Sequence, residues 1–291
     1  MCMENIIFEV VGGIGKNIVA TAVVRAIKKQ YPDKNIILQT AYPEVFINNP
    51  NIYRIYRYGN MPYFYDNHIN GHDVAFMCNE PYKTDGYLLG IDPLSKSWCD
   101  VHDVQWDGSK PDIYLTPLEI QRVSTKISPQ KPLLLIQPFS GFSTEIKYSW
   151  NRDIPPMQMF EIASTLSNKY QILQIGRPDQ IQVPNTTLFH SNDIRELLSL
   201  VAISNARLCV DSFVQHAAAA FNMPSVVCWV TDKPLVTGYD LHKNIHPAAD
   251  MSVQTTIDGG YQLYDFNGGK IFDYPFSHTN IFNINEILSN F

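Results

Sequence analysis

The chain has 291 residues, of which 45% are hydrophobic and 17% charged, a balance that excludes a disordered protein and allows one large or two medium domains. The formal net charge of −6 argues against a surface that holds nucleic-acid phosphates, so nucleic acid is not an expected partner.

The first segment predicts a strand, a tight turn and a helix. Residues 6–11 are mostly apolar and β-branched, residues 12–15 are rich in glycine, and apolar residues from 18 to 27 recur at helical spacing. Residues 35–39 predict a second strand. A strand, a helix and a strand at this spacing form a βαβ unit, which implies a parallel sheet.

The stretch 41–130 is rich in Tyr, Asn, Pro and Gly. It predicts loops and short elements, with a strand at 73–77. Two prolines within 128–132 indicate a linker. We therefore expect an N-terminal domain at 1–130, a C-terminal domain at 131–280 and a terminal helix at 281–291.

After the linker, the alternation of strand and helix starts again. The expected strands are 133–136, 171–176, 207–210 and 225–230, and the expected helices are 155–170, 194–204 and 214–221. Asn192 and Asp193 are candidate N-cap residues for the second of these helices. The pattern predicts an α/β protein of two doubly wound, Rossmann-like domains, with a cleft between them at the carboxyl ends of both sheets.

The cysteines and the apolar runs indicate a cytoplasmic protein. The chain has five cysteines without C-x-x-C spacing, which favours reduced thiols over disulfides or a zinc site. Cys209 and Cys228 lie in apolar runs and are expected in the core. The first residues lack the features of a signal peptide, and no stretch approaches the ~20 apolar residues of a membrane span. A membrane-bound substrate would be met at the inner membrane face, from its surface.

The glycine turn Gly12-Gly13-Ile14-Gly15-Lys16-Asn17 has two interpretations. A glycine-rich turn that opens a helix can present backbone N–H groups to an anion. The dinucleotide fingerprint fits only in part, because Ile18 stands at its third glycine. The phosphate-loop pattern also fails, because Val10 replaces its first glycine and Asn17 its Ser/Thr. The alternative is a tight turn without a ligand.

Four further groups of polar residues follow predicted strands, and in an α/β protein ligands bind at the carboxyl ends of strands. Asp211, Ser212, Gln215 and His216 stand at a strand end and in the first turn of a helix, whose free N–H groups suit a diphosphate. The other three groups are Ser140 with Lys147, Gly176 with Arg177, and Asp232 with Lys233. Lys147 could neutralise a leaving diphosphate, or it is a solvated surface lysine.

Several of these segments resemble the heptosyltransferase family (glycosyltransferase family nine). The resemblance lies in residues 12–32 (GGIGKNIVATAVVRAIKKQYP), the Asn48-Asn49-Pro50-Asn51 turn, Lys147-Tyr148-Ser149-Trp150, Ile175-Gly176-Arg177-Pro178, and the blocks 195–197, 211–212 and 216–224. These segments make up a minor part of the chain, and residues 60–130 show no match. The block from Asp211 to Pro224 is the most specific of them.

The resemblance implies a GT-B fold and an inverting, metal-independent hexosyl or heptosyl transferase without a cofactor. Its co-substrate would be a nucleotide-diphosphate sugar, bound by the C-terminal domain. The acceptor, bound by the N-terminal domain, would be a glycan, a lipid-linked molecule or a protein. By position, the donor-binding residues are Gly13, Gly15, Ser140, Gly176, Arg177, Asp211, Ser212, Gln215, His216, Thr231 and Asp232. The candidate catalytic residues are Lys16, Asn17 and Lys147.

The sequence departs from the family pattern at two positions. Lys16 stands where the family has an acid that acts on the acceptor, and Phe213 stands where it has a glycine. A protonated lysine cannot accept a proton, whereas a desolvated one could. The base would therefore be Lys16, an acid such as Glu9 or Asp211, or a residue from 60–130. Two other functions stay open: a protein that binds a sugar nucleotide or glycan without turnover, and a different enzyme such as a sugar-nucleotide epimerase.

Overall fold

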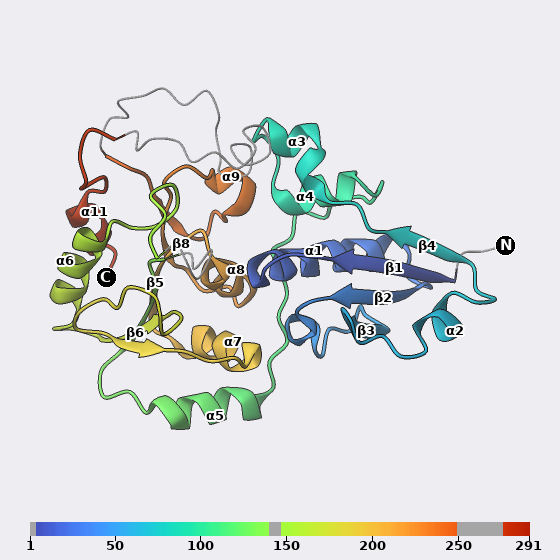
Figure 1. The fold of residues 1–291 in the computed structure, drawn as a ribbon, viewed down its shortest axis with the longest axis horizontal. Helices are drawn as coiled ribbons and strands as arrows, with labels where there is room; N and C mark the ends of the chain where they lie inside the picture. The colour runs from blue at the N-terminus through green and yellow to red at the C-terminus, as the bar shows by residue number, and fades with distance from the viewer. Residues whose placement is uncertain (1–3, 140–146, 249–275) are drawn as a thin grey trace. The chain divides into compact units, whose positions relative to one another are not determined.

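The computed structural model describes residues 4–139, 147–248 and 276–291, and it divides the chain into two compact units, Met1–Thr116 and Pro117–Phe291 (Figure 1). The division falls before helix α5 (Pro117–Ile127) rather than at the linker expected near residue 130. Helix α5 packs on helix α7 (Ile194–Ile203) and buries Val123. Its apolar side therefore belongs to the second unit.

The first unit contains a four-stranded parallel sheet in the order β3-β2-β1-β4. Its strands are β1 (Asn5–Val10), β2 (Asn35–Thr40), β3 (Arg54–Arg57) and β4 (Val74–Met77), and its α-helices are α1 (Ile14–Gln30), α2 (Phe64–His68), α3 (Asp85–Leu88) and α4 (Leu94–Asp100). The expected βαβ unit and the strand at 73–77 are confirmed. The other elements are short and come from the stretch that predicted loops and short elements.

Both faces of this sheet are covered, which explains the continuous apolar run of β1. Phe8 points toward helix α4, where its ring centroid lies 5.6 Å from that of Trp98. Ile7 points to the other face and packs with Ile37 and Tyr56. Neighbouring residues of one strand thus serve opposite faces.

The second unit contains a six-stranded parallel sheet in the order β10-β9-β8-β5-β6-β7. Its strands are β5 (Leu133–Gln137), β6 (Gln171–Ile175), β7 (Thr187–Phe189), β8 (Ala206–Val210), β9 (Val226–Cys228) and β10 (Lys243–Ile245). Its remaining helices are α6 (Pro156–Leu166), α8 (Phe213–Ala220), α9 (Pro234–Thr237) and α11 (Ile284–Leu288). The expected strands and helices of this half are confirmed, with the added edge strands β7 and β10.

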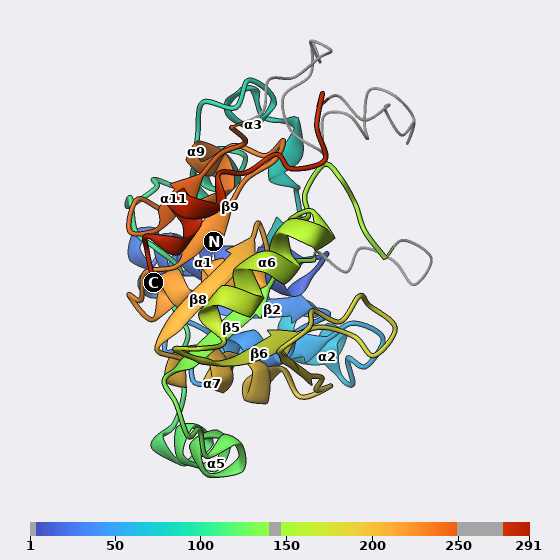
Figure 2. The ribbon, with the colours of Figure 1, turned by 90° about the vertical axis from the view of Figure 1, so that its left-hand side faces the viewer.

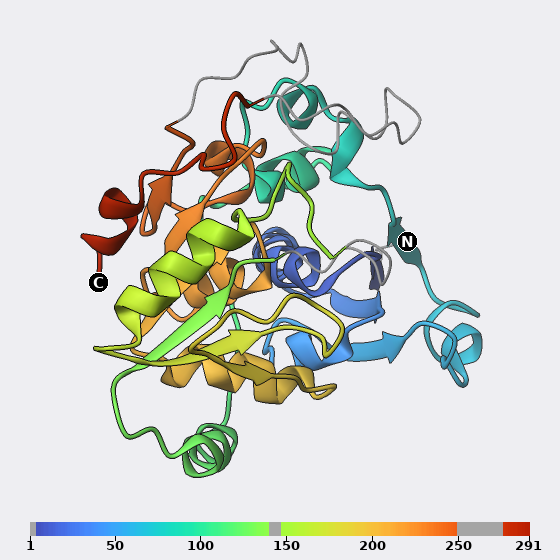
Figure 3. The same ribbon diagram turned by 60° about the vertical axis from the view of Figure 1, so that its left-hand side comes forward.

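Two layers of helices cover this second sheet. Helices α6 and α11 lie on one face, over a core that includes Leu134, Ile136 and Leu208 (Figure 2). Helices α7 and α8 contact each other on the opposite face (Figure 3). Asp193 caps α7 by accepting hydrogen bonds from the backbone N–H groups of the first turn, as predicted. Cys209 and Cys228 are fully buried, which confirms that they are core residues.

None of the helices in the described part of the chain is long and apolar enough to cross a bilayer.

Candidate functional site

In each sheet, successive strands are first added on one side of the first strand and then on its other side. In the first unit, β1 lies between β2 and β4, and in the second unit, β5 lies between β6 and β8. Ligands of open α/β sheets bind at the carboxyl ends of the strands at such a switch point. The candidate site residues are therefore those that follow β1 and β4 in the first unit, and β5 and β8 in the second.

The glycine turn after β1 is held from inside by Asn17. The Asn17 side chain is fully buried, and its Nδ2 donates to the Gly13 carbonyl oxygen at 2.9 Å while its Oδ1 accepts from the Thr40 hydroxyl. Gly13 is the N-cap of α1, and a Cβ placed on it would meet no atom within 4 Å. Gly15 lies in the first turn of α1. Asn17 thus shapes the turn, and Gly13 leaves space beside the helix end.

Lys16, also in the first turn of α1, is enclosed by three side chains. Its ammonium forms an ion pair with Glu80, and it lies 4.7 Å from the ring centroid of Tyr82 and 5.2 Å from that of Trp98. Burial lowers the pKa of Lys16, and the Glu80 carboxylate opposes this effect. The Lys16 stem folds over Gly12. Two features favour glycine at position 12: its φ is 102°, and a Cβ added there would lie only 3.0 Å from Lys16 Cδ.

In the second unit, Arg152 joins two carboxylates that follow neighbouring strands. Its Nη2 lies 3.5 Å from Asp211 Oδ2, and its Nε lies 3.5 Å from Asp232 Oδ2. Asp211 follows β8 and Asp232 follows β9, and the pairing of these strands brings the two acids together. Both side chains are largely buried, with exposed fractions of 8% and 13%. The site therefore holds one guanidinium between two acids.

His216 is a buried, neutral ring in this cluster. Its Nδ1 shares a hydrogen bond of 2.9 Å with the Tyr239 hydroxyl, and its Nε2 lies 3.7 Å from Asp211 Oδ1, beyond hydrogen-bonding range. Burial, reinforced by the charge of Arg152, lowers the pKa of His216 to about 3.

Two buried polar atoms near the start of α8 have no hydrogen-bond partner among the described residues. They are the Ser212 hydroxyl at the N-cap and Oε1 of Gln215, whose Nε2 donates to Asp211 Oδ1 at 2.8 Å and to the Thr237 carbonyl oxygen at 2.9 Å. Thr231 donates through Oγ1 to the Asn151 carbonyl oxygen at 2.9 Å. Unpaired buried polar atoms are costly, so a ligand that pairs with them would bind favourably.

The residues after β6 form a separate group. Arg177 donates through Nε to Asp179 Oδ1 at 3.1 Å, and a Cβ on Gly176 would come within 2.7 Å of Gln180 Oε1. This group follows β6, which β5 separates from β8. The exposed Lys147 contributes, after Arg177, to a lowered pKa of the Asp179 carboxyl. Ser140 lies outside the described residues.

The structure therefore brings together part of the expected donor residues. Asp211, Gln215, His216 and Asp232 lie within one network around Arg152, Ser212 follows Asp211 in the chain, and Thr231 adjoins the network. The Gly176 and Arg177 group lies two strands away from β8.

Sequence reasoning missed Glu80, Arg152 and Tyr239. Glu80 follows a strand, which is a usable signal, whereas Arg152 and Tyr239 lie in loops whose course only the fold decides. Across residues 4–139, 147–248 and 276–291, no three His, Cys, Asp or Glu side chains group as metal ligands would.

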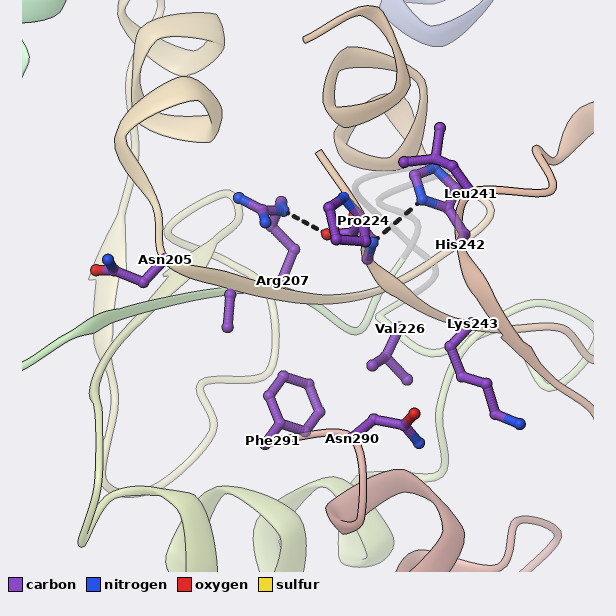
Figure 4. Close-up of a pocket in the computed structure, with 11 residues that line it drawn as sticks. Asn205, Arg207, Pro224, Val226, Leu241, His242, Lys243, Asn290 and Phe291 are labelled. Atoms are coloured by element: carbon purple, nitrogen blue, oxygen red, sulfur yellow. Dashed lines mark hydrogen bonds between the residues drawn. The ribbon is translucent and has the colours of Figure 1, made fainter. Parts of the chain in front are cut away.

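Two cavities lie at the amino ends of the strands, on the edge opposite to these residues. One of about 410 Å³ is lined by Arg207, Val226 and Lys243, which belong to β8, β9 and β10, and by the terminal Phe291 (Figure 4). The Arg207 guanidinium is occupied by the carbonyl oxygens of Ser204 and Pro224. The other cavity, of about 580 Å³, lies at the amino ends of β1, β2 and β3.

Comparison with solved structures identifies the fold. A glycosyl transferase of family 9 from Veillonella parvula superposes with a TM-score of 0.70 at 12% identity, covering 99% of this chain and 97% of that chain. Escherichia coli ADP-heptose lps heptosyltransferase II gives 0.64 at 13% identity, covering 91% and 95%. The iron-containing dodecameric glycosyltransferase TibC of enterotoxigenic E. coli gives 0.61 at 12% identity, covering 94% and 68%. No protein-family model matches the chain, and no curated protein sequence matches it.

These similarities confirm the expected GT-B fold of two Rossmann-like domains. The expected cleft between the two domains stays a prediction.

Proposed function

We propose that this protein is a glycosyltransferase of the heptosyltransferase type that uses a nucleotide-diphosphate sugar, inverts the anomeric carbon and needs no metal. The observation that carries the proposal is the network of Arg152, Asp211 and Asp232 at the switch point of the second sheet. It occurs in a chain whose whole length shares its fold with a family 9 glycosyl transferase.

The donor is proposed to bind at the carboxyl edge of the second sheet. Its diphosphate would accept hydrogen bonds from Ser212 and from the free N–H groups at the start of α8, with Arg152 and Lys147 as the cations that stabilise the leaving group. His216, which is neutral at pH 7, would act as a hydrogen-bonding group rather than as a charge. Thr231 and Asp232 would lie beside the nucleoside.

The remaining donor residues of the second unit are proposed around the same diphosphate. They are Ser140, Gly176, Arg177, Asp211 and Gln215. Gln215 Oε1 is the unpaired acceptor among them. Gly13 and Gly15 stay predicted donor-binding residues of the glycine turn in the first unit.

The acceptor is proposed to bind at the carboxyl edge of the first sheet, beside Lys16 and the turn that Asn17 holds. Its chemistry would be that of a glycan, a lipid-linked molecule or a protein that offers a hydroxyl group. A lipid-linked acceptor would be reached from the membrane surface.

A thermal-shift screen of the full chain against ADP-, GDP-, UDP-, dTDP- and CMP-sugars tests this proposal. A donor at about 100 times its Kd stabilises the folded state by about 2.7 kcal/mol, which raises the melting temperature by several degrees. We expect Lys147→Ala to weaken the response of the matching donor by about tenfold in Kd. The matched control is Lys243→Ala, a lysine at the amino edge of the same sheet. If no donor shifts the melting temperature of the wild-type protein, the proposed function fails. If both variants respond alike, Lys147 does not contribute to the donor site.

One observation favours a second candidate, a protein that binds a sugar nucleotide or glycan without turnover. Lys16 occupies the place of the expected acid and is ion-paired. Release of nucleoside diphosphate from a bound donor separates the two candidates, because only an enzyme releases it.

A further inference from the structure

The first sheet places an acid at its switch point, in a loop far from the glycine turn in sequence. Strand β4 pairs in parallel with β1, so the loops that follow these two strands flank the switch point. Lys16 comes from the first loop and its helix, and Glu80 is the third residue after β4. The ion pair between Lys16 and Glu80 therefore spans the switch point.

Within this pair, the carboxylate is the more accessible partner. The exposed fraction of the side chain is 31% for Glu80 and 10% for Lys16. The ammonium is covered by the rings of Tyr82 and Trp98, whereas Glu80 uses only Oε2 to hold it. Oε1 of Glu80 makes no hydrogen bond within the described residues, so one oxygen is available to a substrate.

The other acids considered as bases are less suited. Both oxygens of Asp211 are engaged, one by Gln215 and the other by Arg152. Glu9 lies beside the Tyr58 hydroxyl and the Cys78 thiol: burial raises the pKa of both groups and Glu9 raises it further, with a smaller contribution from Glu80 at Tyr58. Side chains alternate along β1, so Glu9 leaves the strand on the face opposite to Phe8, which packs on α4.

We propose that Glu80 is the general base of the transfer reaction and that Lys16 is its positioning residue, an inference that rests on the proposed function. The acceptor hydroxyl gives its proton to Glu80 Oε1 as its oxygen forms a bond to the anomeric carbon of the donor. The bond from that carbon to the diphosphate breaks, and the diphosphate leaves with the electron pair. Lys16 holds and orients Glu80 through their ion pair, so the acid missing at position 16 is supplied by the loop after another strand.

The test uses the full chain and a donor identified by the thermal-shift screen, with water as the acceptor and release of nucleoside diphosphate as the readout. General-base catalysis contributes about 10²- to 10⁴-fold, so Glu80→Gln should lower kcat by at least about 100-fold while the donor still raises the melting temperature. It should also remove the acidic limb of the kcat/KM pH profile. In Glu80→Ala, added sodium formate should restore part of the rate.

The matched control is Glu44→Gln, which removes an acid of similar exposure, 27%, that pairs with Arg57 in the same unit. It should turn over at the wild-type rate. Lys16→Met should lower kcat, because the carboxylate loses the cation that orients it, whereas Lys16→Arg should restore most of the wild-type rate.

Three results would overturn the assignment. If the wild-type protein releases nucleoside diphosphate and Glu80→Gln does so within a factor of about 3, Glu80 is not the base, although the proposed function stands. A loss confined to Glu9→Gln would transfer the role to Glu9. If the wild-type protein binds donor but releases no nucleoside diphosphate at any pH, the proposed function fails and the catalytic role of Glu80 fails with it.

Discussion

Acidification should destabilise the second unit through His216. Burial lowers the pKa of His216 to about 3 in the folded protein, against an ordinary value of 6.5 for histidine. Below the pKa of His216 in the unfolded chain, the unfolded chain binds a proton at this residue that the folded chain does not bind. The stability that depends on a neutral His216 is therefore fully present above pH 6.5 and is lost as the pH falls toward the folded pKa.

The size of the effect follows from the pKa difference. One pKa unit corresponds to about 1.4 kcal/mol, so the free energy of unfolding should fall by about 2 kcal/mol between about pH 8 and pH 5 through this group alone. By about pH 3 the loss should reach about 4 kcal/mol.

Urea unfolding of the wild-type protein and of His216→Asn at these two pH values measures this contribution. The variant should be less stable than the wild type at about pH 8, but its free energy of unfolding should fall by about 2 kcal/mol less on acidification. Tyr239→Phe removes the hydroxyl partner and keeps the ring buried, so it should retain most of the wild-type pH dependence. An equal loss in the wild type and in His216→Asn would refute the reasoning, because His216 would then bind protons equally in both states.

Two other substitutions test the local structure. Gly12→Ala should lower the free energy of unfolding by about 1–3 kcal/mol, because φ at Gly12 is 102° and the added Cβ meets the Lys16 stem; a melting temperature equal to the wild type would contradict this. Arg195→Met should cost about 2 kcal/mol by thermal unfolding, because Arg195 donates to both oxygens of Glu119 at 2.7 and 2.9 Å in a partly buried pair. Its control, Lys126→Met, removes a half-exposed lysine and should stay within about 0.5 kcal/mol, so similar costs for the two variants would show that burial does not distinguish these pairs.

The sequence alone predicted the elements whose signal is local. The apolar run of β1, the glycine turn and the helical spacing of α1 lie next to one another in the chain. Asp193 predicted the start of α7 because a capping side chain bonds to the N–H groups just after it. Helix α5 was missed, since its amphipathic side has meaning only against α7.

Some residues of the candidate site were likewise predictable from local sequence, whereas their pairings were not. Asp211, Ser212 and His216 were predictable because they follow one strand and open one helix. The pairing of Lys16 with Glu80, and of Arg152 with Asp211 and Asp232, was not, because it depends on which strands become neighbours. Strand order is decided by packing between segments far apart in the chain, so only the tertiary structure could bring these charges together.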